Sequence, residues 1–356
     1  MPKSAQTIVD FRSDNTGRAS PELIEALAKA NQGTAAGYGT DEWTAALQKR
    51  FSEIFEKAVR GFPVSTGTAA NALALGAVCP SHGAIYCSEP AHISSSEANA
   101  AGFFSGGGRL STVASVSAKI QPEALQAAID SIVIGNAHYS QPAALSITQA
   151  NEMGAVSTLA EVRALTDITR AYKMKVHMDG ARFANALARL GCTPAELTWK
   201  SGIDILSFGC TKNGGLLADA IVVFVPEVAD LLALQLQRGG QVWSKGRFGA
   251  AQLLAYVEND LWMKNARAAN AAGARIAAGL KSIPGAKLLA PIDANMVFLD
   301  LPGSVMDGLE RDGIQFFRRT RTMARFVCRF DVTDAEIDAL LASLKRHCGA
   351  VASAAQ

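Results

Sequence analysis

Short apolar runs alternate with helical repeats over most of the chain, and this alternation limits the possible fold more than any other feature. Residues 21–31 and 40–55 carry apolar side chains at helical spacing, with Ser20 and either Thr40 or Asp41 as candidate N-caps. The apolar runs have the length of buried strands and occupy residues 83–88, 143–148, 175–179, 204–208 and 220–225. Strands separated by helices predict βαβ units around a mainly parallel sheet, which is an α/β fold.

The pattern changes near residue 250. A long helical stretch at 250–281 is followed by strand-like runs at 296–301 and 324–330, and the capping signal at 333–336 begins a last helix. We therefore expect two domains, a large domain at 1–249 and a small C-terminal α+β domain at 250–356.

Charge and cysteine content exclude several classes of protein. The formal net charge of the 356 residues is +2 with both signs interspersed, so we expect neither nucleic-acid nor membrane binding. The N-terminal residues lack the apolar segment of a secretory signal. The six cysteines form no CxxC pair, and no histidine pair has zinc spacing, so we expect free thiols, no metal site and a cytoplasmic location.

The segment SFGCTKNGG (207–215) places Lys212 just after a predicted strand, among glycines and small polar residues. Such a lysine can be approached closely by a ligand, and its amine can bond to an aldehyde if burial or a cationic neighbour lowers its pKa. The alternative is a surface lysine without a chemical role.

The segment HMDGARFANA (177–186) places Asp179 at the C-terminal end of another predicted strand, where α/β sheets form their ligand sites. A carboxylate there can keep the ring nitrogen of a pyridine cofactor protonated. Arg182 follows one helical turn later. The alternative is a helix-capping aspartate followed by a solvated arginine.

A third segment, VSTGTAANALALGAV (64–78), leads from a turn containing Ser65, Gly67 and Thr68 into an apolar helix. Backbone N–H groups at a helix N-terminus bind anions such as a phosphate ester, although an unliganded threonine cap is an open alternative. The segment has neither the GK[ST] ending of a nucleotide-binding loop nor a GxGxxG pattern, which disfavours a nicotinamide dehydrogenase. In SEPAHISSSEANAAG (88–102), His92 and Glu97 are candidates for ring stacking or proton transfer.

Taken together, these segments resemble the low-specificity L-threonine aldolases, which are fold-type I enzymes that use pyridoxal 5'-phosphate (PLP). The resemblance covers nearly the whole chain. It is carried by DFRSDN (10–15), GYGTDEW (37–43), STGTAAN (65–71), AHISSSE (91–97), ITQANEMG (147–154), HMDGARF (177–183), AELTWKSGIDILSFGCTKNG (195–214) and ARFVCRF (324–330). It implies a seven-stranded, mainly parallel sheet in the large domain and a homodimer or homotetramer with shared active sites.

The resemblance also implies roles for single residues. Lys212 would carry PLP, Asp179 would pair with its ring nitrogen and His92 would stack on its ring. Further residues resemble those of the family that contact the cofactor: Gly67 and Thr68 at the phosphate and Arg182 at the phenolic oxygen. From a neighbouring subunit, Lys245 would contact the phosphate, with Arg238 as the less favoured alternative.

Other residues resemble those that contact the substrate. Ser13 and Arg325 would grip its α-carboxylate, His138 would lie near its hydroxyl, and Tyr38 would come from a neighbouring subunit. Thr148 and Gln149 differ from the acidic residue and asparagine of some relatives, and this leaves the contact near the PLP ring oxygen open.

The implied reaction is reversible cleavage of L-threonine, L-allo-threonine and related β-hydroxy-α-amino acids to glycine and an aldehyde. Its base could be His92, His138 or a water that they hold, with Glu97 a weaker candidate. A phenylserine-type aldolase or a β-eliminating lyase on the same scaffold is the nearest alternative. A protein of this fold without catalytic activity would have no chemical need for Lys212, Asp179 and Arg325 together.

Overall fold

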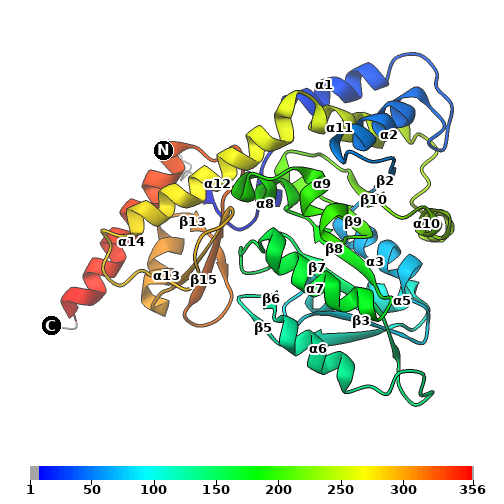
Figure 1. Ribbon diagram of the computed structural model, residues 1–356. Coiled ribbons are helices and arrows are strands. Elements are labelled where there is room, and N and C mark those ends of the chain that lie inside the picture. Colours follow the sequence, from blue (N-terminus) through cyan, green and yellow to red (C-terminus); the bar gives the residue numbers. More distant parts are fainter. Residues whose placement is uncertain (1–7, 355–356) are drawn as a thin grey trace.

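The computed structural model describes residues 8–354 and is built around a seven-stranded sheet (Figure 1). In spatial order its strands are β2 (Arg60–Val64), β10 (Asp219–Val223), β9 (Ile205–Phe208), β8 (Lys175–Gly180), β7 (Gln141–Thr148), β3 (Gly83–Ser88) and β4 (Arg109–Val113). All neighbouring pairs from β9 to β4 are parallel, and only β10 runs antiparallel to its neighbours. This sheet confirms the predicted fold class.

Helices cover both faces of this sheet, which explains why its strands are apolar runs without alternation. The core on one face includes side chains of α3 (Gly67–Val78) and α10 (Pro226–Arg238). The core on the other face takes side chains from α2 (Glu42–Ile54), α6 (Pro122–Asp130), α7 (Leu159–Ala171) and α8 (Phe183–Leu190). Because successive strand residues point to opposite faces, Ile205 lies in the first core and Leu206 in the second.

The first two helices begin where the sequence predicts. Asp41, and not Thr40, caps α2 by accepting a hydrogen bond from the backbone N–H of Thr44 at 2.9 Å. Ser20 stands at the N-cap of α1 (Pro21–Ala30) without capping it through its side chain. Its Oγ instead accepts a hydrogen bond from Asn265 Nδ2 at 3.0 Å. Ser20 therefore ties the start of α1 to a distant helix.

The helical stretch expected at 250–281 is two helices, α11 (Arg247–Val257) and α12 (Leu261–Leu280), separated by the 3₁₀ turn η4 (Glu258–Asp260). Asn259 and Asp260 have φ angles of 49° and 59°, a left-handed conformation that ends a right-handed helix and that Asn and Asp adopt more readily than most residues. Apolar periodicity continues across this break, so periodicity alone did not reveal it.

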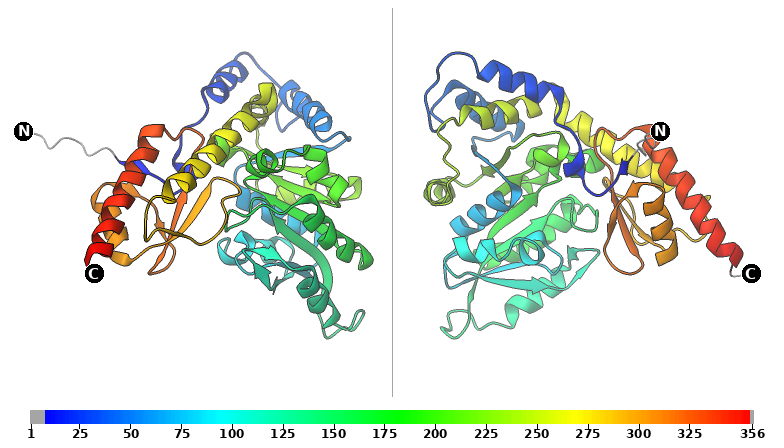
Figure 2. Two further views of the ribbon diagram at one scale, coloured as in Figure 1. Left: turned by 60° about the vertical axis from the view of Figure 1, so that its left-hand side comes forward. Right: turned by 180° about the vertical axis from the view of Figure 1, so that it is seen from behind.

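A second sheet of four antiparallel strands follows α12. In order these are β11 (Lys287–Leu288), β12 (Met296–Asp300), β15 (Met323–Val327) and β14 (Phe317–Arg318). The helices α13 (Gly303–Arg311) and α14 (Asp334–Ala354) contribute to its core, and α14 lies alongside α12 (Figure 2). The N-terminal strand β1 (Val9–Asp10) pairs with β13 (Ile314–Gln315), so the start of the chain packs in the C-terminal part.

Helix α12 connects the two cores. Trp262 and Ala266 pack in the core of the large sheet, whereas Ile276 and Leu280 pack with the four-stranded sheet. The division into domains at 1–249 and 250–356 remains a proposal. The packing suggests two refinements: the boundary would fall within α12, and the small domain would also include Val9 and Phe11.

The remaining elements are short. They are η1 (Asp14–Thr16), α4 (His92–Ser95), α5 (Ala100–Phe104), β5 (Ser115–Val116), β6 (Lys119–Ile120), α9 (Pro194–Leu197), η2 (Trp199–Ser201) and η3 (Thr211–Asn213). Between residues 8 and 354, no helix combines the length and the apolar character needed to span a bilayer.

Candidate active site

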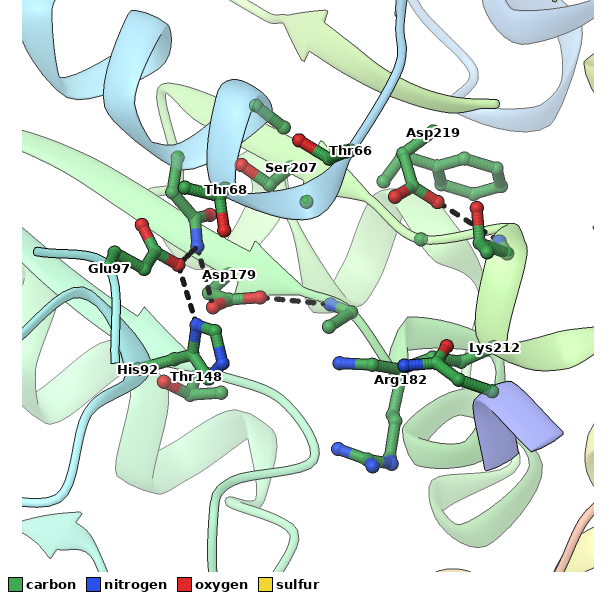
Figure 3. Close-up of a pocket in the computed structure, with 18 of the residues that line it drawn as sticks. Thr66, Thr68, His92, Glu97, Thr148, Asp179, Arg182, Ser207, Lys212 and Asp219 are labelled. Atoms are coloured by element: carbon green, nitrogen blue, oxygen red, sulfur yellow. Dashed lines mark hydrogen bonds and ion pairs between the residues drawn. The ribbon is translucent and has the colours of Figure 1, made fainter. Parts of the chain in front are cut away.

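A cavity of about 360 Å³ opens at the C-terminal ends of the parallel strands β7, β8 and β9 (Figure 3). The N-terminal turn of α3, the short helix α4 and the loop after β9 complete its wall. Open α/β sheets place ligands at this edge because the loops that follow parallel strands converge there. The cavity brings together Gly67, Thr68, His92, Asp179, Arg182 and Lys212 from the predicted site.

Lys212 lies in η3, directly after β9, as the sequence predicts. Asn213 fixes this turn by donating hydrogen bonds to the Tyr256 hydroxyl and to the Trp262 carbonyl, both at 2.8 Å. Burial lowers the pKa of the Lys212 amine, and the nearby positive charge of Arg182 lowers it further. A lowered pKa increases the neutral fraction of the amine, and the neutral amine is the form that attacks a carbonyl.

Asp179 lies at the end of β8 and is only 4% exposed. Its Oδ1 accepts a hydrogen bond from the backbone N–H of Ala181 at 3.0 Å, and its Oδ2 accepts one from Asn71 Nδ2 at 2.9 Å. It pairs in register with Ser207 of β9, five residues before Lys212. The sheet therefore holds the carboxylate and the lysine at the same cavity.

The N-terminus of α3 also faces the cavity, with Gly67 and Thr68 as its first two residues. The helix is capped by Thr66, whose side chain accepts a hydrogen bond from the backbone N–H of Ala69 at 3.0 Å. The other N–H groups of this turn can therefore serve a ligand, and the helix dipole favours an anion there.

His92, Glu97 and Asn71 form a hydrogen-bonded chain to Asp179 (Figure 3). His92 Nδ1 lies 2.7 Å from Oε1 of the buried Glu97, and Asn71 Nδ2 donates to the same Oε1 at 2.9 Å. The hydrogen bond to Glu97 raises the pKa of His92. An ionised Glu97 can only accept, so Nδ1 carries a proton and Nε2 is left for other partners.

Arg182 forms a bidentate ion pair with Asp14. Its Nε lies 2.7 Å from Oδ2 of Asp14, and its Nη2 lies 3.1 Å from Oδ1. Burial opposes the ionisation of Asp14, but the charges of Arg182 and Lys212, together with hydrogen bonds from Arg182 and Asn295, hold its pKa below the ordinary value. This pair links the loop after β8 to the N-terminal segment. Contact of Arg182 with a cofactor oxygen remains a prediction.

Ser13 and Arg325, the predicted carboxylate-binding pair, lie near the cavity but are not among the described residues that line it. Ser13 caps η1 by accepting a hydrogen bond from Asn15, which does line the cavity. Arg325 Nη2 donates to the Arg12 carbonyl at 3.2 Å, while its buried Nε has no partner among the described residues. Burial, helped by the charge of Arg182, lowers the pKa of Arg325 to about 10.

Three further predicted residues lie away from this cavity within one chain. His138 is exposed in the loop before β7, at the N-terminal edge of the sheet and therefore opposite Lys212. Tyr38 is 66% exposed, and its backbone N–H donates to the Ser244 carbonyl at 3.2 Å, next to the exposed Lys245. For these three residues, a role in catalysis or binding requires a second copy of the chain and stays a prediction.

Several residues of the cavity wall were missed from the sequence: Asn71, Glu152, Ser207 and Asp219. Asp219 accepts hydrogen bonds from the backbone N–H groups of Cys210 and Thr211 at 2.8 and 3.0 Å, which anchors the lysine loop. Asn71 follows Gly67 at helical spacing and could have been found from that signal. Glu152 lies four residues after the predicted strand at 143–148, just as Lys212 lies four residues after its own strand, so its position was a usable signal. Asp219 begins the antiparallel strand β10 and carries no such signal.

A parallel sheet with an aspartate at the end of one strand and a lysine after the next is the architecture of fold-type I PLP enzymes. Two solved structures share this fold. A threonine aldolase from Leishmania major is 21% identical, with 95% of this chain and 99% of that chain covered and a TM-score of 0.89. A serine palmitoyltransferase variant from S. paucimobilis, solved with a bound PLP–myriocin aldimine, is 16% identical, with 97% and 88% covered and a TM-score of 0.72.

The beta-eliminating lyase family model matches residues 10–302. A low specificity L-threonine aldolase from Pseudomonas sp. (strain NCIMB 10558) is 38% identical over 336 residues, which are 94% of this chain and 96% of that protein. The chain therefore belongs to the beta-eliminating lyase family, in its low-specificity L-threonine aldolase branch, and is a lyase. This confirms the predicted resemblance and enzyme class.

Proposed function

We propose that this chain cleaves L-threonine, L-allo-threonine and related β-hydroxy-α-amino acids reversibly to glycine and an aldehyde, with PLP as cofactor. The observation that carries the proposal is the placement of Lys212, Asp179 and the N-terminus of α3 around one cavity. The activity of the Pseudomonas relative, as its name gives it, supports the same reaction.

The groups of the cavity fit PLP. A lysine of lowered pKa can bind its aldehyde, a buried carboxylate can bind its ring nitrogen, and helix N–H groups can bind its phosphate. When bound, PLP supplies an electron sink that weakens the bonds at the amino acid Cα.

Two side chains of the protein, those of Asp179 and Lys212, would bind the cofactor and control where it carries protons. Asp179 would hold a proton at the ring nitrogen, and the hydrogen bonds from Asn71 and Ala181 fix the direction of its carboxylate. Lys212 would hold the cofactor through its amine. The lowered pKa of this amine favours that bond, because the amine must lose its proton before it can attack an aldehyde.

Arg325 and Ser13 would orient the substrate by its α-carboxylate. Arg325 remains a cation at neutral pH even with its pKa near 10, and its buried Nε lacks a protein partner among the described residues. A planar guanidinium suits a carboxylate because it can donate two parallel hydrogen bonds. Fixing the carboxylate sets which bond at Cα faces the electron sink.

His92 is the residue that we assign as base for the β-hydroxyl. Its Nδ1 proton is committed to Glu97, so Nε2 can accept the hydroxyl proton directly or through a water. His138 stays the alternative, contributed from a second copy.

We propose a homodimer or homotetramer in which Tyr38 and Lys245 reach the site of a neighbouring subunit. Both residues are exposed and adjoin a second cavity, of about 480 Å³, which is lined by Tyr38, Trp243 and Gly246 among others. Mixing a Lys212→Ala chain with a Tyr38→Ala chain should restore activity if sites are shared across subunits. A fully active monomer in sedimentation would contradict this proposal.

We also propose that the protein works in the cytoplasm. All six cysteines are free thiols, as is usual in a reducing compartment. Activity that fractionates with the periplasm or medium would contradict this location.

Product analysis tests the reaction. Purified protein supplied with PLP and L-threonine should release glycine and acetaldehyde in equal amounts, and L-allo-threonine should behave alike. Ammonia and a keto acid would instead indicate the β-eliminating alternative. A strong preference for phenylserine would indicate the aryl-specific alternative.

A further inference from the structure

Glu152 is a second carboxyl group in the wall of the cavity, and the reaction outlined above does not use it. It follows β7, whose last residue, Thr148, pairs in register with Asp179. Glu152 Oε1 accepts two hydrogen bonds, one from the backbone N–H of His92 at 2.9 Å and one from the Thr148 hydroxyl at 3.0 Å. His92 and Thr148 lie together at one side of the cavity (Figure 3).

The two oxygens of Glu152 have different surroundings. Oε2 is buried and has no hydrogen-bond partner among residues 8–354, whereas Oε1 has two. An ionised carboxylate shares its charge between both oxygens, and burying one of them without a donor is costly. A protonated carboxyl group carries no charge and therefore loses less on burial. Glu97 also has a buried Oε2 without a partner among the described residues, but its Oε1 is bonded to the imidazole of His92, and Glu152 has no such partner.

The groups around Glu152 also favour its protonated form. The titratable side chains near its carboxyl group are Asp179 of β8 and Cys87 of β3. Neither is a cation, so neither stabilises an ionised Glu152. His92 contacts it from α4 only through the backbone, since the imidazole ring is bound to Glu97. Burial, helped by the negative charge of Asp179, raises the pKa of Glu152. The described surroundings thus contain no cation bonded to this carboxyl group.

We propose that Glu152 carries a proton on Oε2 and donates it as a hydrogen bond to an oxygen of the ligand that Lys212 and Asp179 hold. This inference rests on the proposed function for the identity of the ligand, PLP. The two neighbouring carboxyl groups then differ in protonation, with Asp179 ionised and Glu152 neutral. Such a division is how one cavity holds both an anion and an acid at the same pH.

Infrared spectroscopy of the ligand-free protein tests the protonation state separately from binding. The difference spectrum between the wild type and Glu152→Gln should show loss of a protonated-carboxyl C=O band. Glu161→Gln is the matched control, because Glu161 caps α7, pairs with Lys119 and has a lowered pKa. Its difference spectrum should show loss of carboxylate bands only. The same carboxylate pattern for Glu152→Gln would overturn the proposal.

PLP affinity, measured by titration of fluorescence, tests the donated hydrogen bond. Glu152→Gln keeps a neutral donor and should bind PLP within a few-fold of the wild type. Glu152→Ala should bind about tenfold more weakly, as expected for loss of one hydrogen bond. Wild-type affinity should also weaken as alkali ionises Glu152, so the ratio of wild-type to Glu152→Gln affinity should fall with rising pH, while the titration of Lys212 affects both proteins alike.

A glutamine variant as weak as the alanine variant would overturn the proposal, because it would mean that the site needs a carboxylate. If the wild type bound no PLP at all, the proposed function and the donated hydrogen bond would fail together. The infrared band would then still decide whether Glu152 carries a proton.

Discussion

His92 Nδ1 lies 2.7 Å from Glu97 Oε1, and this contact fixes the tautomer of the neutral histidine and raises its pKa. A buried carboxylate that orients an imidazole in this way is the arrangement by which histidine bases are prepared for proton transfer. Asn71 extends the arrangement by donating to both Glu97 and Asp179. The proposed base and the partner of the cofactor nitrogen therefore belong to one hydrogen-bond network.

Replacing Glu97 with Gln should change the pH profile of kcat. Glu97 raises the pKa of His92, and a base acts only when it is unprotonated, so the acidic limb of the wild-type profile lies at a raised pH. Without the carboxylate the pKa of His92 falls, and the acidic limb should move to lower pH. Maximal kcat should drop by about 10- to 100-fold as orientation is lost.

The control for this experiment is Glu196→Gln, since Glu196 caps the short helix α9 away from the cavity. It should leave the profile unchanged. A Glu97→Gln profile that matched the wild type would show that His92 is not the base.

Replacing Asp14 with Asn should destabilise the protein strongly. It removes the ionic partner of Arg182, whose side chain is 12% exposed, and leaves a cation with little solvent around it. Breaking a buried ion pair on one side costs about 3 kcal/mol or more. The free energy of unfolding in urea measures this change. Asp167→Asn breaks an exposed pair with Arg170 and should change stability little. Equal effects of the two substitutions would contradict the account of Asp14.

His177 should make the protein sensitive to acid. It lies between Ser146 and Ser207, 2.9 Å from each hydroxyl, and burial lowers its pKa to about 4. An unfolded histidine titrates near its ordinary value of 6.5, so between pH 6.5 and 4 the unfolded chain binds the extra proton. Stability due to this group is complete above pH 6.5 and falls toward pH 4, by about 3 kcal/mol.

Urea unfolding at several pH values measures this dependence. His177→Asn should lose this part of it, whereas substitution of the exposed His82 should not. An unchanged acid dependence in His177→Asn would contradict the assignment.

Replacing Gly214 with Ala should disturb the lysine loop. Gly214 has a φ angle of 103°, and a Cβ there would collide with Ser20 Oγ and Asn265 Nδ2. We expect a loss of about 2 kcal/mol or more from backbone strain and displaced neighbours, together with weaker PLP binding. Gly33→Ala provides the comparison, because Gly33 also has a positive φ but open space around it. Gly214→Ala with no more effect than Gly33→Ala would show that the close approach does not matter.

Local patterns revealed the parts of the site that lie at the ends of strands. Lys212 and Asp179 could be predicted because each follows an apolar run and is flanked by glycine, and Gly67 because it begins a helix. Their convergence depends on the order of strands, and pairing partners far apart in the chain decide that order. Glu152 was missed although it follows the predicted strand at 143–148, because a glutamate after a strand does not by itself indicate a site.

The family resemblance assigned other residues to the site but did not say whether they reach it within one chain or from a second copy. His138 was expected near the substrate, yet its loop precedes β7 and therefore lies at the wrong edge of the sheet to reach Lys212 directly. Asn259 and Asp260 interrupt a helix that apolar spacing predicted to be continuous, because spacing records side-chain burial and not backbone φ.

Reduction with borohydride followed by peptide mapping tests the central claim most directly. Protein supplied with PLP should show a visible absorbance band that borohydride abolishes, and the reduced cofactor should then be found attached to Lys212. Lys212→Ala should show neither the band nor a modified peptide. Attachment to another lysine, or no attachment in protein that is folded and supplied with PLP, would contradict the account.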